Sequence, residues 1–459
     1  MEPNIALLLG TGFIMFVLHM ESKDEAPAPA SLWIFTIWFF VIGSRPLMLW
    51  IYPSGVVVSD LDYDGTGGST ANTIFFLFCT AVAVMILLRR KISISSIIQN
   101  NISLFILLAY CGISCLWSEY PAASLRRWIR MLFEVVVIIV IVSDVNRMET
   151  VKRLITRYAY IAIPLSVILI KYFPQFGVQW NSIGSTKMWS GVAVHKNAFG
   201  AAMGACCIFF AWKAFVLKDE NRKILDLFLV MLCAYMLINP EGKGSTTSLM
   251  STVIALLFLL VMLFFKGKTN TIRVSLFAAI GIYFFLNMVT SLLINKSLLE
   301  FVISSAGREM TFTDRTVIWE AIMNIASQNK LAGVGYGAFW TGERYFELYK
   351  EIGVTSSHSG FIEVYADIGL IGLVLLLLVI FAALNNTLKN LEQDFYLNTF
   401  NVAIISYVIA SSFFETVFLQ PATFRWVIFL IASLHVPRIE LEKNKMTEMS
   451  ISGHKFGNA

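Results

Sequence analysis

The sequence predicts an all-α polytopic integral membrane protein with about 12–13 transmembrane helices and one large loop. The 459-residue chain is 57% hydrophobic and only 14% charged, whereas a soluble globular chain carries roughly 25% charged residues. Mean hydropathy is +0.72, and the charges lie in short stretches between long apolar runs. A net charge of +5 is too small to indicate a nucleic-acid partner. Composition therefore excludes a soluble enzyme, a disordered chain and a secreted disulfide scaffold.

The six cysteines lie within or at the ends of apolar runs, without the spacing of metal ligands. We interpret them as small apolar side chains and predict neither a disulfide framework nor a zinc site. The first apolar run lacks a preceding cationic stretch and a small-residue cleavage site, so we expect it to be retained as a span.

Each long apolar run is predicted to be a helix, because a bilayer core of ~30 Å needs about 20 apolar residues and leaves no backbone polar group unpaired. The predicted spans are 5–20, 32–52, 72–88, 103–117, 128–142, 158–173, 194–217, 224–239, 248–265, 272–290, 360–384, 398–418 and 424–436. We thus divide the chain into ten spans in 1–290, a large loop at 291–359, three spans in 360–436 and a tail at 437–459.

Lysine and arginine in the short loops predict the orientation, because such loops remain in the cytoplasm. Basic residues mark the loops near 89–91, 147–157, 218–223 and 266–273, which fall on alternate connections. The tail at 437–459 then also lies inside. The opposite side receives 53–71, 119–127, 174–193, 240–247 and the large loop.

The large loop is roughly 70 residues long, and connections of that length are generally functional. Apolar residues recur at helical spacing after Thr313 and Asp314, either of which could serve as the N-cap. The helix should end near Asn329. We expect an amphipathic helix at 314–329, lying over the membrane face.

Two polar clusters precede the large loop on this outer side. Arg126 and Arg127 stand where the orientation rule disfavours cations, which suggests an anionic partner; the alternative is interfacial anchoring of the arginines. His195, Lys196 and Asn197 stand at the entry of a helix rich in small residues. A cation and a neutral donor at a helix N-terminus favour anion binding, and the alternative is a polar helix cap.

Two further clusters lie in and after the large loop. Arg308 and Arg315 open the amphipathic helix, and guanidinium groups match phosphate oxygens in bidentate fashion. Surface ion pairs with neighbouring carboxylates are the alternative. His358 comes just before a predicted span. Its imidazole could take a proton from a sugar hydroxyl, although a histidine standing alone is more often structural.

These stretches together resemble the bacterial O-antigen ligase and polymerase family (Wzy/WaaL-like), and within it the ExoQ-like exopolysaccharide polymerases. The ordered motifs are SLWIFTIWFFVIGSRP at 31–46, CLWSEYPAASLRRWIR at 115–130, GVAVHKNAFG at 191–200, GREMTFTDRTVIW at 307–319, GVGYG at 333–337 and HSGFIEVYADIGLIG at 358–372. His358 and Gly369 reproduce the family's His-x10-Gly spacing.

The resemblance implies a multispanning (GT-C-like) glycosyltransferase, acting without a metal or cofactor on the periplasmic face of the bacterial inner membrane. Its donor would be an undecaprenyl-diphosphate-linked oligosaccharide and its acceptor a glycan, with membrane lipid around it and a flippase and a chain-length regulator as partners. His358 would activate the acceptor hydroxyl. Arg308 and Arg315 would hold the diphosphate, with Arg126, Arg127 and Lys196 as further candidates.

The chain departs from the family pattern at Ser359, where asparagine is common, and at Asp314, where glycine is common. We expect an inverting polymerase, because the sequence offers one base and no evident carboxylate nucleophile. Two alternatives remain open. One is a ligase that transfers the glycan to lipid A core or protein, and the other is a transporter or flippase that binds the lipid diphosphate without cleaving it.

Overall fold

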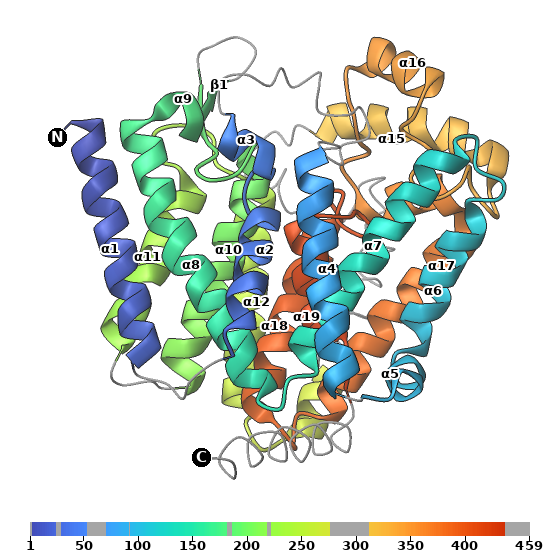
Figure 1. Ribbon diagram of the computed structural model, residues 1–459. Helices are drawn as coiled ribbons and strands as arrows, with labels where there is room; N and C mark the ends of the chain where they lie inside the picture. Colours follow the sequence, from blue (N-terminus) through green and yellow to red (C-terminus); the bar gives the residue numbers. More distant parts are fainter. Residues whose placement is uncertain are drawn as a thin grey trace.

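The structure is a computed structural model, and it describes residues 2–23, 29–52, 70–90, 92–180, 186–217, 222–275 and 312–436. The elements of the first half are α1 (Pro3–Lys23), α2 (Ser31–Ile42), α3 (Leu47–Ile51), α4 (Thr70–Arg90), α5 (Ile94–Asn100), α6 (Ile102–Ser114), α7 (Pro121–Val142), α8 (Arg147–Tyr172), α9 (Pro174–Gly177), β1 (Val178–Trp180) and β2 (Lys187–Trp189). The second half contains α10 (Lys196–Trp212), the π-helix η2 (Lys213–Leu217), α11 (Lys223–Ile238), α12 (Thr246–Phe264), α15 (Phe312–Ala326), the 3-10 turn η3 (Ser327–Asn329), α16 (Glu343–Ile352), α17 (Gly360–Lys389), α18 (Phe395–Ser412) and α19 (Phe424–Ser433). Most helices run side by side through the body of the molecule (Figure 1).

The predicted all-α polytopic class is confirmed. Within the described ranges, seven helices are long and apolar enough to cross a membrane, or eight if the bent pair of α5 and α6 forms one span. The spans predicted at 32–52 and 424–436 correspond to the shorter apolar helices α2 and α19. Most of the predicted span at 272–290 lies outside the described residues.

Helix α10 forms the centre of the bundle and is buried from Phe199 to Trp212. Its glycines allow close packing: a Cβ at Gly200 would lie 2.7 Å from the Ser245 Cβ, and a Cβ at Gly204 would lie 2.6 Å from the Thr252 Oγ1. Small residues permit such close approach between membrane helices. The N-terminus of α10 is therefore firmly placed.

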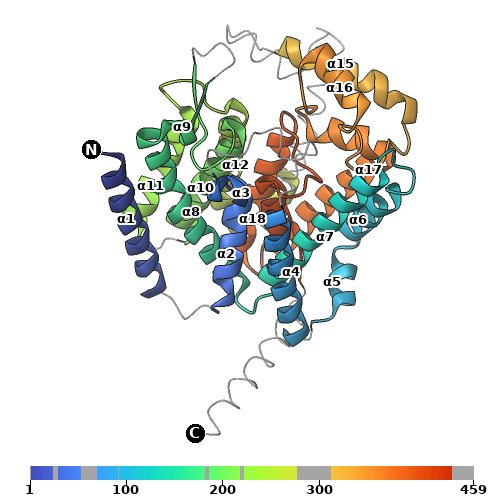
Figure 2. The ribbon, with the colours of Figure 1, turned by 45° about the horizontal axis from the view of Figure 1, so that its top comes forward.

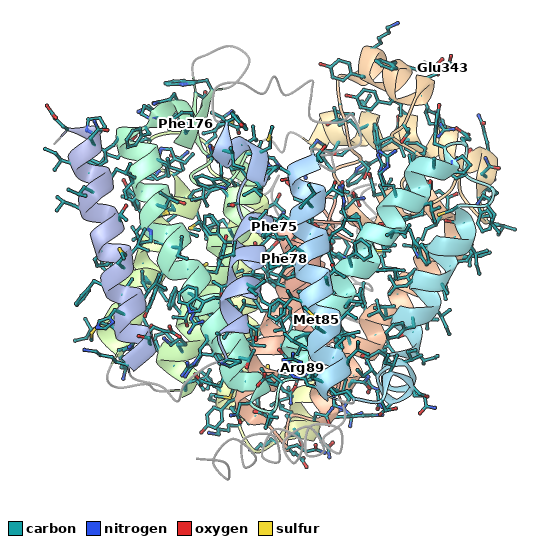
Figure 3. The ribbon with its side chains drawn as sticks, viewed as in Figure 1. Phe75, Phe78, Met85, Arg89, Phe176 and Glu343 are labelled. Atoms are coloured by element: carbon teal, nitrogen blue, oxygen red, sulfur yellow. The ribbon has the colours of Figure 1, made fainter. Side chains whose placement is uncertain are left out.

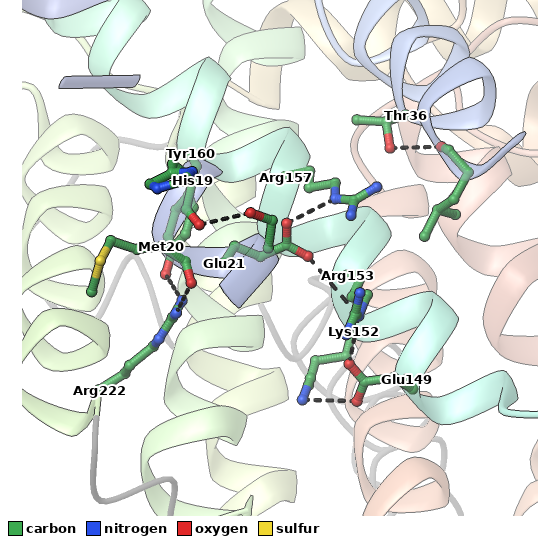
Figure 4. Close-up of polar contacts among 12 residues, drawn as sticks. His19, Met20, Glu21, Thr36, Glu149, Lys152, Arg153, Arg157, Tyr160 and Arg222 are labelled. Atoms are coloured by element: carbon green, nitrogen blue, oxygen red, sulfur yellow. Dashed lines mark hydrogen bonds and ion pairs between the residues drawn. The ribbon is translucent and has the colours of Figure 1, made fainter. Parts of the chain in front are cut away.

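The two ends of the bundle differ in their polar contacts, and Figure 3 places Arg89 near one end and Phe176 and Glu343 near the other. The end near Arg89 contains ion pairs that join α1 to α8 (Figure 4). Arg157 and Arg153 contact Glu21 at 3.0 and 4.0 Å, and within α8 Arg153 also contacts Glu149 at 2.8 Å. Carboxylates thus balance much of the positive charge at this end.

The opposite end carries α3, α9, the antiparallel β1–β2 pair, α15 and α16 (Figures 1 and 2). Helix α15 and the 3-10 turn that follows occupy the region predicted as an amphipathic helix at 314–329. The α15–α16 region has a small core of its own, separate from that of the bundle. Its buried members are Ile318, Ile322, Ala326, Val334, Ala338, Phe339, Trp340, Leu348 and Ala366.

Candidate functional site

His358 stands in a constrained turn between α16 and α17. Its φ of 51° places a non-glycine residue in the left-handed region, a conformation that costs about 1–3 kcal/mol and concentrates at functional sites. Neighbouring contacts hold the turn: Ser357 N donates to Glu363 Oε2 at 3.1 Å, and Trp319 Nε1 donates to Ser357 O at 2.9 Å. The half-buried imidazole is therefore presented on rigid backbone.

A break in α17 fixes the short helical segment that follows His358. Ile368 and Gly369 have non-helical dihedral angles, and Gly369 has a φ of 69°. The freed amides of Leu370 and Ile371 donate to the carbonyls of Lys330 and Leu331, at 2.8 and 3.2 Å. The break in α17 is thus hydrogen-bonded to the residues just before the GVGYG segment. This contact gives a structural reason for the glycine of the His-x10-Gly spacing.

Arg315 and Glu415 lie within electrostatic range of His358. The Arg315 guanidinium stands 5.5 Å from the centre of the Phe414 ring, and Glu415 is only 8% exposed. Burial lowers the pKa of His358 below 6.5, while Glu415 raises it and Arg315 lowers it further. Burial also lowers the pKa of Arg315, and Glu415 opposes that shift. One carboxylate therefore acts on both the predicted base and the predicted phosphate ligand.

His195 joins the same group while capping α10. Its Nδ1 accepts a hydrogen bond from Ala198 N at 3.2 Å, so the cap interpretation is confirmed. With Nδ1 accepting, a neutral imidazole carries its proton on Nε2 and can donate there. Burial lowers the pKa of His195, Glu415 raises it, and Arg425 and His358 lower it. His195 is thus both a cap and a neighbour of the site.

Arg45 holds the loop that leads to His195. Its guanidinium donates to the carbonyls of Phe176 and Gly191, each at 2.9 Å, and to that of Val192 at 3.1 Å. A guanidinium in a planar fork can serve several acceptors at once. The Ser-Arg-Pro sequence at the end of the first motif therefore shapes the neighbouring His-Lys-Asn motif.

Lys196 lies near the site, and Asn197 takes part in it through its backbone carbonyl. Lys196 lies within electrostatic range of Glu415 and Lys243. Arg425, 6% exposed, donates to Ser248 Oγ at 2.6 Å and to the Asn197 carbonyl at 3.5 Å. The structure thus gathers three cations, on α10, α15 and α19, around the loop that carries Glu415.

Of the other predicted arginines, the two on α7 are placed differently. Arg308 lies outside the described residues, and Arg126 is exposed on α7. Arg127 is buried, its charge acts on Glu363 and Asp367, and a Cβ added at Gly337 would lie 2.7 Å from its Cδ. This position favours a structural role for Arg127 beneath the His358 turn.

Glu415 and Arg425 were missed by sequence reasoning, whereas the expectation that no carboxylate serves as nucleophile stays a prediction. Both residues fall inside predicted spans, at 398–418 and 424–436. An ionisable residue within an apolar span is a functional-site signal, so the sequence did contain an indication. Within the described ranges, no three His, Cys, Asp or Glu residues lie close enough together to hold a metal ion.

An apolar groove of about 380 Å³ opens between α15 and α17. It is lined by Met323, Lys330, Phe361, Ile362, Tyr365, Leu370 and Leu373. The Phe361 ring also packs on Phe413 and Phe418, with ring centres 5.1 and 5.6 Å apart. The groove therefore adjoins the loop that carries Glu415, with Lys330 as the one cation of its lining.

The family model described as O-antigen ligase matches residues 228–377. This stretch of the chain is therefore similar to the O-antigen ligase family. The matched stretch includes α12, α15, α16, the His358 turn and the break in α17, so the resemblance seen in the motifs is confirmed. The chain is also 27% identical over 304 residues to the exopolysaccharide production protein ExoQ of Rhizobium meliloti (strain 1021). That similarity covers 63% of this chain and 66% of ExoQ, just under two thirds of the relative's length.

Proposed function

We propose that this multi-pass membrane protein is a glycosyltransferase that polymerises glycan repeat units carried on undecaprenyl diphosphate. The two comparisons support a polysaccharide polymerase or ligase in general. The observation that carries the specific proposal is the convergence of His358, Arg315 and Glu415 at one end of the bundle. We place this end on the periplasmic side of the inner membrane, because the basic loops favour the opposite end for the cytoplasm.

The site residues divide the reaction between them. The neutral His358 imidazole takes the proton of the acceptor hydroxyl as its oxygen bonds to the anomeric carbon of the donor sugar. The bond from that carbon to the diphosphate oxygen breaks, and the electron pair leaves with the diphosphate. Arg315 and Lys196 stabilise the charge that develops there, as fixed donors do in sites with little water. Glu415 stabilises the imidazolium that forms.

Displacement in a single step inverts the anomeric configuration, and we assign this course because His358 serves as base and Glu415 as its charge partner. A covalent intermediate on Glu415 would instead retain the configuration after a second displacement. The anomeric configuration of the product, compared with that of the donor by NMR, separates the two. A retained configuration would refute the single displacement.

The groove between α15 and α17 supports a lipid-linked donor. Its lining is apolar apart from Lys330, and the neighbouring side chains of Ile371 and Val374 on α17 are exposed. Exposed apolar side chains on a membrane helix face lipid. We assign the groove to the polyprenyl chain, entering sideways from the bilayer.

The decisive experiment uses purified full-length protein in liposomes, lipid-linked repeat unit as donor, and a chelator to remove divalent metal. We expect glycan chain growth with release of undecaprenyl diphosphate, and its loss in His358→Gln with donor binding retained. His435→Gln is the matched control, because His435 is also partly buried but contacts Asn101 and Asn390 away from the site. Growth unaffected by His358→Gln would exclude the histidine as base.

The same experiment tests a ligase, the second candidate, which the description of the matching family favours. A ligase would give no product until lipid A core or a protein acceptor was added. Translocation of intact donor without any glycosidic product would instead indicate a transporter. For the polymerase, we place a flippase that supplies donor and a chain-length regulator as its partners.

A further inference from the structure

The loop between α18 and α19, residues 413–423, bends through two strained positions. Leu419 has a φ of 59° and Ala422 a φ of 58°, and neither residue is glycine. The left-handed conformation brings Cβ close to a carbonyl oxygen, so it persists only where other contacts hold it. The same loop carries Glu415, whose charge acts on His358, His195 and Arg315.

Tyr336 holds the first strained position. Its hydroxyl donates to the Leu419 carbonyl at 2.7 Å, and its own backbone amide donates to Ser114 Oγ at 3.0 Å. The side chain is 2% exposed. Tyr336 lies within the GVGYG segment, and the adjacent Gly335 amide donates to Asp367 O at 2.8 Å. One segment thus contacts both the helix after His358 and the loop with Glu415.

Glu134 on α7 holds the second strained position. It is 1% exposed, and one of its carboxylate oxygens accepts a hydrogen bond from the Ala422 amide. Its other oxygen, Oε2, has no hydrogen-bond partner among the described residues. A buried carboxylate oxygen without a hydrogen-bond partner requires an explanation. The hydrogen bond that Glu134 does accept, from the Ala422 amide, fixes the turn.

We propose that Tyr336 and Glu134 are positioning residues that clamp the 419–422 turn and thereby hold the Glu415 carboxylate beside His358. Packing transmits the position along the loop: a Cβ at Gly360 would lie 3.3 Å from the Phe418 ring and 3.4 Å from the Glu415 carbonyl. Loop and His358 turn therefore meet directly. The GVGYG segment acts as a spacer that sets the separation between Glu415 and His358.

The test is an NMR titration of isotope-labelled histidine in the full-length protein, with the His358 signal assigned among five histidines by the His358→Gln variant. The charged neighbours that act on His358 are Glu415 and Arg315, and His195 lies nearby. Tyr336→Phe keeps the ring and removes only the hydroxyl. We expect it to lower the pKa of His358 in the same direction as Glu415→Gln, because the carboxylate moves away.

The double variant Tyr336→Phe/Glu415→Gln should lower that pKa no further than Glu415→Gln alone, since coupled residues are non-additive. Two fully additive shifts, or an unchanged pKa in Tyr336→Phe, would overturn the clamp. Glycan transfer, which rests on the proposed function, should fall about tenfold in Tyr336→Phe. A wild-type protein without transfer would refute the proposed function, whereas the titration would still decide the clamp.

Glu134 is tested with a matched pair. Glu134→Gln retains an oxygen that can accept from the Ala422 amide, so the pKa of His358 and the transfer rate should stay near wild type. Glu134→Leu should behave like Tyr336→Phe. Equal losses in Glu134→Gln and Glu134→Leu would show that accepting this hydrogen bond is not what Glu134 contributes. If Glu134→Leu does not fold, a lowered pKa of His358 in Glu134→Gln would by itself overturn the assigned role of Glu134.

Discussion

Replacing Gly369 by alanine should remove the hydrogen bonds between the break in α17 and the residues just before the GVGYG segment. Gly369 has a φ of 69° and a ψ of −168°, a region that only glycine occupies readily, and an alanine there costs about 1–3 kcal/mol. A Cβ at this position would also lie 2.3 Å from the Leu331 carbonyl oxygen. Relieving that clash breaks the hydrogen bonds of the Leu370 and Ile371 amides, each worth about 1 kcal/mol net. The sum is roughly 3–5 kcal/mol.

Gly353 provides the matched control, because it has the same φ of 69° but no atom within 4 Å of an added Cβ. Gly353→Ala should therefore cost only about 1 kcal/mol. Thermal unfolding in detergent, followed by tryptophan fluorescence, should show a much larger decrease in midpoint for Gly369→Ala. Glycan transfer should decrease more than tenfold in that variant alone. Equal midpoints for the two variants would refute the argument that the break is fixed by this contact.

Three further outcomes follow from the site. Burial keeps the pKa of His358 below 6.5, while Glu415 raises it, so transfer should be lost only as pH falls below about 6.5. In a pH profile of kcat/KM, Glu415→Gln should move that loss to lower pH. A move to higher pH would contradict the assignment of His358 as base. Leu373→Trp should fill the groove and raise KM for a long-chain donor but not for a short-chain analogue. Leu377 is exposed on α17 outside the groove lining, so Leu377→Trp should change KM for neither donor. Equal effects of Leu373→Trp on both donors would argue against the groove as the site of the lipid chain. His195→Asn should preserve the α10 cap, since asparagine is a favoured N-cap, and should lower transfer with little change in unfolding midpoint; a wild-type rate would restrict His195 to capping.

The class of the protein was predictable because composition and run length alone define membrane helices. Local motifs also placed His358, Arg315, His195 and Lys196 at one end of the molecule. The motifs could do so because basic residues on alternate loops determine which loops lie on the same side of the membrane. Residues that form one site must at least lie on the same side.

The remainder depended on tertiary contacts. Nothing in the spacing of α7 distinguishes Arg127, which faces the interior, from Arg126, which is exposed. Glu415 was missed because one charged residue at the end of a span hardly changes the hydropathy averaged over that span. The break at Gly369 left a sequence trace only as a spacing, and its reason became visible once the carbonyls of Lys330 and Leu331 were seen to accept the freed amides.

The surroundings of Arg45 have an electrical consequence. Its hydrogen-bond acceptors are uncharged peptide oxygens, and its aromatic neighbour is the Trp50 ring at 4.9 Å. Dipoles orient around a cation without cancelling its monopole. Arg45 therefore keeps a net positive charge behind the His195 loop, so it would draw an anionic lipid headgroup toward this end before any direct contact forms.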